Sequence, residues 1–80
     1  MQKSDQVETL LDTTGLFCPE PLMLLHSTFK DIKAGDVVKV LATDPSTQRD
    51  IPKFCLFLGH ELLEQEEVGS EYQYRIRKGS

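Results

Sequence analysis

The side chain best suited to chemistry in this sequence is the thiol of Cys18, in the run Gly-Leu-Phe-Cys-Pro-Glu-Pro at residues 15–21. Proline is favoured at the first position of a helix, because its fixed φ suits the turn and its missing N–H is not needed there. Pro19 therefore predicts the first helical residue and Cys18 the N-cap. The partial positive charge of a helix N-terminus favours a thiolate. Pro19 and Pro21 remove two N–H donors and Glu20 adds an opposing charge, so only a modest lowering of the Cys18 pKa is expected.

No general base stands close to Cys18 in the sequence. His26 is two helical turns further on, ~12 Å along a helix axis, and His60 could approach only through the fold. A Cys-His hydrolase is therefore weakly supported, and both histidines are predicted to be ordinary surface residues. The spacing of the two histidines, Cys18 and Cys55 matches no zinc motif, and no metal is expected. A thiol without a base suits thiol exchange or sulfur transfer, but Cys18 as an inert capping or core residue is the alternative.

Three further residues near the middle of the chain are candidates for a role at the site. Cys55 is predicted to pack in the core, with a resolving thiol for Cys18 as the alternative. Asp50 is predicted to be the N-cap of the second helix. Arg49 is a candidate for docking a partner or supporting a persulfide. Cys55 shares its helical spacing with Ile51, Phe54 and Leu58.

The 80 residues correspond to one small domain, predicted at residues 7–80 after a loose tail at 1–6. A domain of this size leaves little room for an enclosed pocket. The net charge of −4 argues against direct nucleic-acid binding. No apolar run approaches the ~20 residues of a membrane helix, and the polar start lacks a secretory signal, so a cytoplasmic location and free thiols are expected. One small basic cluster could steer an acidic partner: Arg75, Arg77 and Lys78.

Hydrophobic periodicity predicts the order strand, helix, strand, helix, strand, strand. The strands are expected at 7–13, 36–43, 61–68 and 72–78, and the helices at 19–33 and 50–58. Each helix has one apolar face, so both should pack on one side of a four-stranded mixed sheet. The first two strands should be parallel and the last two a hairpin. The predicted fold class is thus an α/β (α+β) two-layer sandwich. The apolar faces are predicted from Leu22, Leu25, Phe29 and Ile32, from Val38, Val40 and Ala42, and from Tyr72, Tyr74 and Ile76.

Four runs of the sequence resemble the TusA/SirA-like family of sulfur carrier proteins, and the later runs narrow the likeness to its TusA members. They lie at residues 15–21, 44–55, 59–62 and 72–79. The resemblance implies a βαβαββ fold, in agreement with the periodicity. It also implies that Cys18 accepts sulfur as a persulfide from an IscS-like cysteine desulfurase. The sulfur would then pass to a TusBCD-like complex, through TusE to MnmA, for 2-thiouridine at the tRNA wobble position. Family members also feed molybdenum cofactor synthesis or sulfur oxidation. A monomer with no cofactor of its own is expected.

Two residues depart from the pattern of the family. Phe17 stands where arginine often precedes the cysteine, and Lys53 stands where glycine is usual. Together with Arg49 they are the candidates for partner docking, while Pro19, Glu20 and Pro21 are expected to support Cys18. Two rival functions stay open: a thiol oxidoreductase using Cys18 with Cys55, and a non-catalytic regulatory or interaction module.

Overall fold

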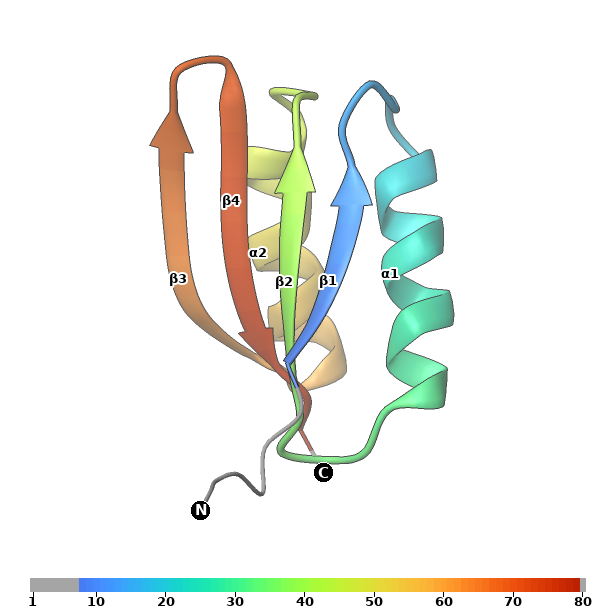
Figure 1. Cartoon of the computed structure of the whole chain (residues 1–80). Helices are drawn as coiled ribbons and strands as arrows, with labels where there is room; N and C mark the ends of the chain where they lie inside the picture. Colours follow the sequence, from blue (N-terminus) through green and yellow to red (C-terminus); the bar gives the residue numbers. More distant parts are fainter. Residues whose placement is uncertain (1–7, 80) are drawn as a thin grey trace.

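The computed structural model describes residues 8–79. They form two helices and four strands, whose arrangement can be followed in Figure 1. The predicted tail at 1–6 and the first predicted strand residue lie outside the described residues. The element order is the predicted βαβαββ. The elements are β1 Glu8–Thr13, α1 Glu20–Asp31, β2 Val37–Ala42, α2 Thr47–Leu58, β3 Glu61–Val68 and β4 Glu71–Arg77.

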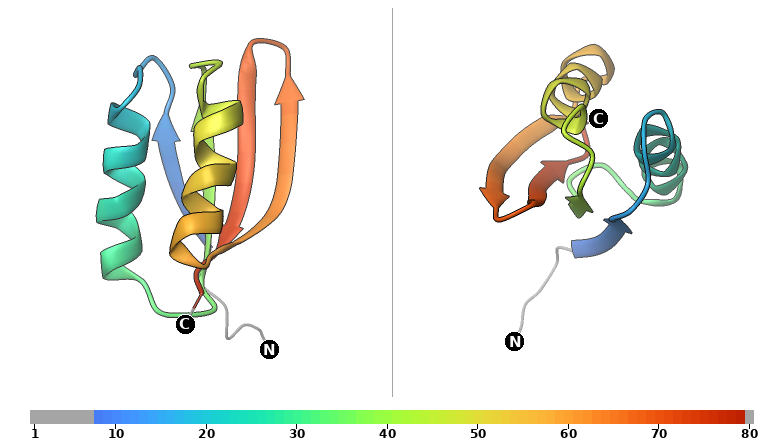
Figure 2. Two further views of the ribbon diagram at one scale, coloured as in Figure 1. Left: turned by 180° about the vertical axis from the view of Figure 1, so that it is seen from behind. Right: turned by 90° about the horizontal axis from the view of Figure 1, so that it is seen from above.

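The four strands form one mixed sheet in the order β1-β2-β4-β3. β1 and β2 are parallel, whereas β4 is antiparallel to both β2 and β3. The two views of Figure 2 show both helices on the same face of this sheet. The predicted two-layer arrangement, with a parallel crossover and a terminal hairpin, is therefore confirmed.

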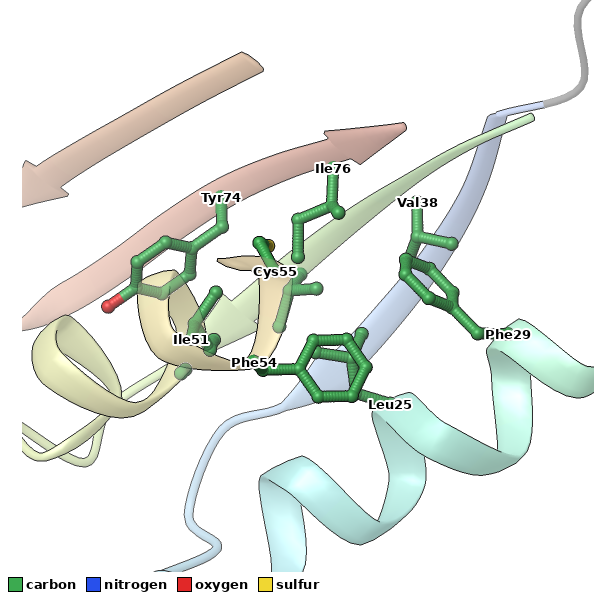
Figure 3. Close-up of a cluster of buried hydrophobic side chains, with 10 residues drawn as sticks. Leu25, Phe29, Val38, Ile51, Phe54, Cys55, Tyr74 and Ile76 are labelled. Atoms are coloured by element: carbon green, nitrogen blue, oxygen red, sulfur yellow. The ribbon is translucent and has the colours of Figure 1, made fainter. Parts of the chain in front are cut away.

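The core lies between the helices and the sheet, as the predicted apolar faces require. Figure 3 shows side chains from α1, α2, β2 and β4 meeting there. Each fully buried aliphatic or aromatic side chain contributes roughly 1.5–3 kcal/mol by leaving water. The predicted position of Leu58 is wrong in part, because its side chain at the end of α2 is 46% exposed. The buried members include Leu25, Phe29, Val38, Val40, Ile51, Phe54, Cys55, Tyr74 and Ile76.

α1 is shorter than predicted at both ends. Pro19 is the N-cap rather than the first helical residue, and its carbonyl accepts the first helical hydrogen bond, from Met23 N–H at 3.1 Å. Cys18 therefore lies one residue before the cap, which corrects its prediction as the N-cap. The helix ends at Asp31, because Ile32 is extended. Lys78 Nζ donates to the carbonyls of Phe29 and Ile32, which satisfies acceptors that the helix end leaves free.

α2 begins three residues earlier than predicted. Ser46 is the N-cap and Asp50 lies within the helix, so the prediction of Asp50 as the cap is wrong. Pro52 consequently lies inside the helix and not in its first turn. A proline there cannot donate to the carbonyl four residues earlier. That carbonyl, of Gln48, accepts instead from Gln65 Nε2 of β3 at 3.4 Å.

Candidate functional site

The site lies at the sheet edge where the parallel strands β1 and β2 both end. Thr13 and Ala42 are paired as the last residues of the two strands, so the loops that follow them are neighbours. Thr13 Oγ1 donates to the Leu41 carbonyl at 2.6 Å, and Gly15 N–H donates to Thr43 Oγ1 at 2.8 Å. These bonds hold the loop that leads to Cys18 against the loop that leads to α2.

Asp44 joins the two loops at Cys18 itself. Its Oδ2 accepts the Cys18 N–H at 2.7 Å, and its Oδ1 accepts the Ser46 N–H at 3.0 Å. Hydrogen bonds from the backbone N–H of Ser46, and then of Cys18, lower the pKa of Asp44. The carboxylate is therefore charged at neutral pH and fixes the backbone of Cys18 relative to the start of α2.

A second set of contacts ties Asp44 to the core. Thr47 Oγ1 donates to the Asp44 carbonyl at 2.7 Å and lies 2.9 Å from the Tyr74 hydroxyl. Thr47 and Tyr74 are both almost fully buried. The position of the Cys18 backbone thus depends on a buried hydrogen-bond network that reaches β4.

The Cys18 thiol is exposed and faces a carboxylate. Its Sγ donates to Asp50 Oδ2 at 3.4 Å. This hydrogen bond, followed by desolvation and by the charges of Asp50 and Asp44, raises the pKa of Cys18, with Ser46 acting in the opposite direction. The expected modest lowering is therefore wrong. Two nearby carboxylates outweigh the helix N-terminus, because a thiol held by an acceptor and facing like charge resists ionisation.

The predicted supporting residues divide into exposed and buried positions. Phe17, Pro19 and Glu20 are exposed beside Cys18, with the Phe17 side chain 66% exposed, whereas Pro21 is buried at the start of α1. Glu20 was expected to supply the charge that opposes thiolate formation, but Asp50 and Asp44 supply it.

The predicted docking residues of α2 lie around Asp50. Arg49 is largely exposed, and its Nε lies 3.4 Å from Asp50 Oδ1. Lys53 and Asp50 line the same open groove between the helices, with a volume of about 330 Å³. The rest of this groove is lined by Leu22, His26, Phe54, Phe57 and Leu58.

Cys55 occupies the packing position that its spacing predicts. It is 3% exposed, and burial raises the pKa of its thiol to about 11. Both cysteines are free thiols. A thiol that ionises so poorly is a weak attacking nucleophile, so Cys55 is ill suited to resolve a disulfide or persulfide on Cys18.

The two histidines have separate environments. His26 is exposed and packs edge-on against Phe54, as a surface residue can. His60 departs from the predicted surface role, because it is half-buried and its Nδ1 accepts the Gly79 N–H at 3.0 Å. Within residues 8–79, the hydrogen-bond partner of the Cys18 sulfur is Asp50 and not a histidine.

The basic cluster predicted to steer an acidic partner is engaged within the molecule. Arg75 pairs with Glu8 at 3.1 Å and Glu64 at 3.6 Å, and Arg77 pairs with Glu61. Lys78 Nζ is bound to backbone carbonyls of α1. These three side chains therefore do not form one free basic patch.

Metal-binding clusters and membrane-spanning helices are both absent from the described residues. Over residues 8–79, no group of three or more histidine, cysteine or acidic side chains is placed to hold a metal ion. Neither α1 nor α2 is long and apolar enough to cross a membrane.

Sequence reasoning missed the carboxylates that surround Cys18. Asp44 is not singled out by its sequence pattern, and Asp50 is predicted only as a helix cap. The signal that could have found them is the predicted parallel pair, since parallel strands bring their following loops to one edge of a sheet. The loop at 14–18 therefore had to meet the segment that begins at 43.

The fold and the site together define a class of protein: a small two-layer α/β protein that displays one exposed thiol just before its first helix. A family model described as "Sulfurtransferase TusA" matches residues 9–78. The chain belongs to this family.

Similar proteins agree with the assignment. The chain is 61% identical over 72 residues to the sulfur carrier protein TusA of Pseudomonas paraeruginosa, covering 90% of this chain and 91% of that protein. It is 62% identical over 71 residues to the sulfur carrier protein TusA of Pseudomonas entomophila, covering 89% of each. The structure of a SirA-like protein from Desulfitobacterium hafniense matches with a TM-score of 0.78 at 23% identity, covering 90% of this chain and 99% of that one. This last likeness shows the fold alone.

Proposed function

We propose that this protein is a sulfur carrier and that Cys18 carries the sulfur as a persulfide. The observation that supports this most directly is that Cys18 has an exposed thiol on a fixed backbone, in a chain of this family. The Cys18 N–H donates to the charged, buried carboxylate of Asp44 at 2.7 Å, and this bond fixes the backbone. Such a thiol is accessible to another protein while its backbone stays fixed. Curated relatives with 61% identity are named sulfur carrier proteins.

The relay that we propose has two partner proteins. A cysteine desulfurase of the IscS type loads Cys18, and a TusBCD-like complex with a TusD-type acceptor takes the sulfur onward, towards 2-thiolation of the wobble uridine in tRNA. The protein acts as a covalent carrier beside these enzymes, as a cytoplasmic monomer and without binding tRNA itself. Its net charge of −4 supports the last point.

The position of Phe17, Arg49 and Lys53 supports a role in docking these partners. Phe17 and Arg49 are exposed, and Lys53 lines the same groove as Asp50. The open form of this groove suits contact with a protein better than enclosure of a small substrate.

A thiol oxidoreductase that pairs Cys18 with Cys55 is less well supported. Cys55 is buried and its thiol pKa is about 11. An attacking thiol works best with a pKa near the ambient pH.

Mass spectrometry of the intact protein tests the proposal. The protein is incubated with cysteine, pyridoxal phosphate and a cysteine desulfurase, and its mass is measured before and after a reductant. We expect a reducible gain of one sulfur atom in the natural sequence and in Cys55→Ala, and no gain in Cys18→Ser. Absence of the gain in the natural sequence, with an active desulfurase present, would refute the carrier role.

A further inference from the structure

Asp50 accepts the hydrogen bond of the reacting atom of the proposed carrier, and its place in the first turn of α2 does not by itself require that contact. It is not the cap of α2, which is Ser46. Its Oδ2 instead points at Cys18 Sγ, 3.4 Å away across a sequence separation of 32 residues. Its side chain is only 18% exposed, so the carboxylate is held at the thiol and does not swing freely in solvent.

The charges around the thiol favour its neutral form. Asp50 of α2 and Asp44 of the preceding loop both act against ionisation of Cys18. Arg49 Nε lies 3.4 Å from the other oxygen of Asp50, but the Arg49 side chain is 69% exposed, so it screens this carboxylate only weakly. A thiolate in the free protein would face two carboxylates at close range.

We propose that Asp50 gates the reactivity of Cys18: in the free protein its carboxylate holds the sulfur as a neutral thiol, and positive charge on the docked sulfur donor releases that hold. The inference rests on the carrier function proposed above and assigns a regulation to the same site. Charge complementarity supports it, because two carboxylates flank an exposed sulfur in a chain of net charge −4.

The gated step is a thiol exchange with a donor that is itself a protein cysteine persulfide. The Cys18 thiolate attacks the terminal sulfur of the donor R–S–S–H, and a new bond forms between that sulfur and Cys18 Sγ. The donor S–S bond breaks, and its inner sulfur leaves with the electron pair as a thiolate, which takes up the proton that Cys18 gave up. The balance is Cys18–SH + R–S–SH → Cys18–S–SH + R–SH, without any external oxidant or reductant.

The gate has a clear advantage for a sulfur carrier. The thiolate is the form of cysteine that reacts with oxidants and electrophiles. A carrier that keeps its exposed sulfur protonated between partners limits such side reactions. It becomes nucleophilic only where a donor is bound.

The first test measures alkylation of Cys18 by iodoacetamide as a function of pH in Cys55→Ala proteins, so that one thiol reports. In Asp50→Asn we expect the midpoint of the profile to move to lower pH and the rate at neutral pH to rise at least about threefold, since a like charge at contact distance is removed. The control Asp31→Asn removes the same charge from the opposite end of α1 and should leave the profile in place. Asp50→Ala should move the midpoint in the same direction, although an alanine side chain cannot donate a hydrogen bond to the thiolate as asparagine can.

Circular dichroism checks that each variant is folded. A profile that stays in place, or moves to higher pH, in both Asp50 variants would overturn the gate.

The second test compares two sulfur donors. Glutathione persulfide has no protein surface, so it cannot place positive charge beside Asp50. A cysteine desulfurase that carries a persulfide is the donor to which our proposal assigns that positive charge. Asp50→Asn should therefore raise the rate of sulfur uptake from glutathione persulfide relative to the rate from the desulfurase. An unchanged ratio of the two rates would show that the donor does not release the gate. Failure of the natural sequence to take sulfur from either donor would instead refute the carrier function, and the alkylation profile would still report on Asp50.

Discussion

The hydroxyl of Thr47 connects the site to the core, and Thr47→Val tests that connection. Thr47 Oγ1 donates to the Asp44 carbonyl at 2.7 Å, so at its 2.9 Å contact with Tyr74 the tyrosine must be the donor. Valine has nearly the same shape but neither donates nor accepts. The Asp44 carbonyl stays bonded, since the Thr47 N–H also donates to it at 3.0 Å. The hydroxyl of Tyr74, which is 0% exposed, loses its only hydrogen-bond partner in the described residues.

The size of the effect follows from these contacts. A lost neutral hydrogen bond costs about 1 kcal/mol, and a buried hydroxyl without a partner costs about 1–3 kcal/mol. Thr47→Val should therefore destabilise the protein by about 2–3 kcal/mol, a large part of the total for a domain of this size. The melting temperature should fall by about 10–20 °C. Burial raises the pKa of Tyr74, so its hydroxyl is still protonated at the pH of the experiment.

A double-mutant cycle makes the prediction sharp. Tyr74→Phe should cost only about 1 kcal/mol, because Thr47 can still donate to Asp44. Replacing both partners removes the unpaired hydroxyl, so Thr47→Val with Tyr74→Phe should be more stable than Thr47→Val alone. Urea unfolding of the four proteins, with the midpoint and m-value of each, measures the cycle. Additive losses, or a double variant less stable than Thr47→Val, would refute the network.

Two further predictions concern side chains outside the site. Burial, then the charges of Lys78 and His26, lower the pKa of His60, whose Nδ1 must be unprotonated to accept the Gly79 N–H. Folding thus favours the neutral form of His60. The contribution of neutral His60 to the free energy of unfolding is present above the ordinary histidine pKa of ~6.5, and it is lost as the pH falls through the lowered pKa of His60 in the folded state. As the pH falls through this window, the urea midpoint should decrease in the natural sequence and decrease less in His60→Asn. An equal decrease in the two proteins would contradict the role of His60. Cys55→Ser should destabilise the protein by about 1–3 kcal/mol, because a hydroxyl enters the core, while the folded variant should still take up sulfur. If urea unfolding shows that the variant is folded and it nevertheless takes up no sulfur, Cys55 has a chemical role.

Hydrophobic periodicity in the sequence was sufficient for the fold and for most of the core. The alternation of Tyr72, Tyr74 and Ile76 and the helical spacing of Leu25 and Phe29 predicted which faces are buried, since period and face are local properties of the chain. Cysteine burial followed in the same way for Cys55. Helix ends were less predictable, because they depend on groups from distant segments. Lys78 satisfies the end of α1, and the Asp44 turn moves the start of α2.

The sequence by itself located the exposed thiol, because a Cys-Pro-x-Pro run before an amphipathic segment places Cys18 beside a helix start whatever the rest of the chain does. Only the tertiary structure decided what surrounds it. Asp44 and Asp50 lie 26 and 32 residues further along the chain, and they meet Cys18 because β1 and β2 are parallel and end at one edge. The helix N-terminus, the local effect, predicted a lower Cys18 pKa. The carboxylates are the non-local effect: the hydrogen bond from the sulfur to Asp50 and the charges of Asp50 and Asp44 oppose ionisation, so they reverse the sign.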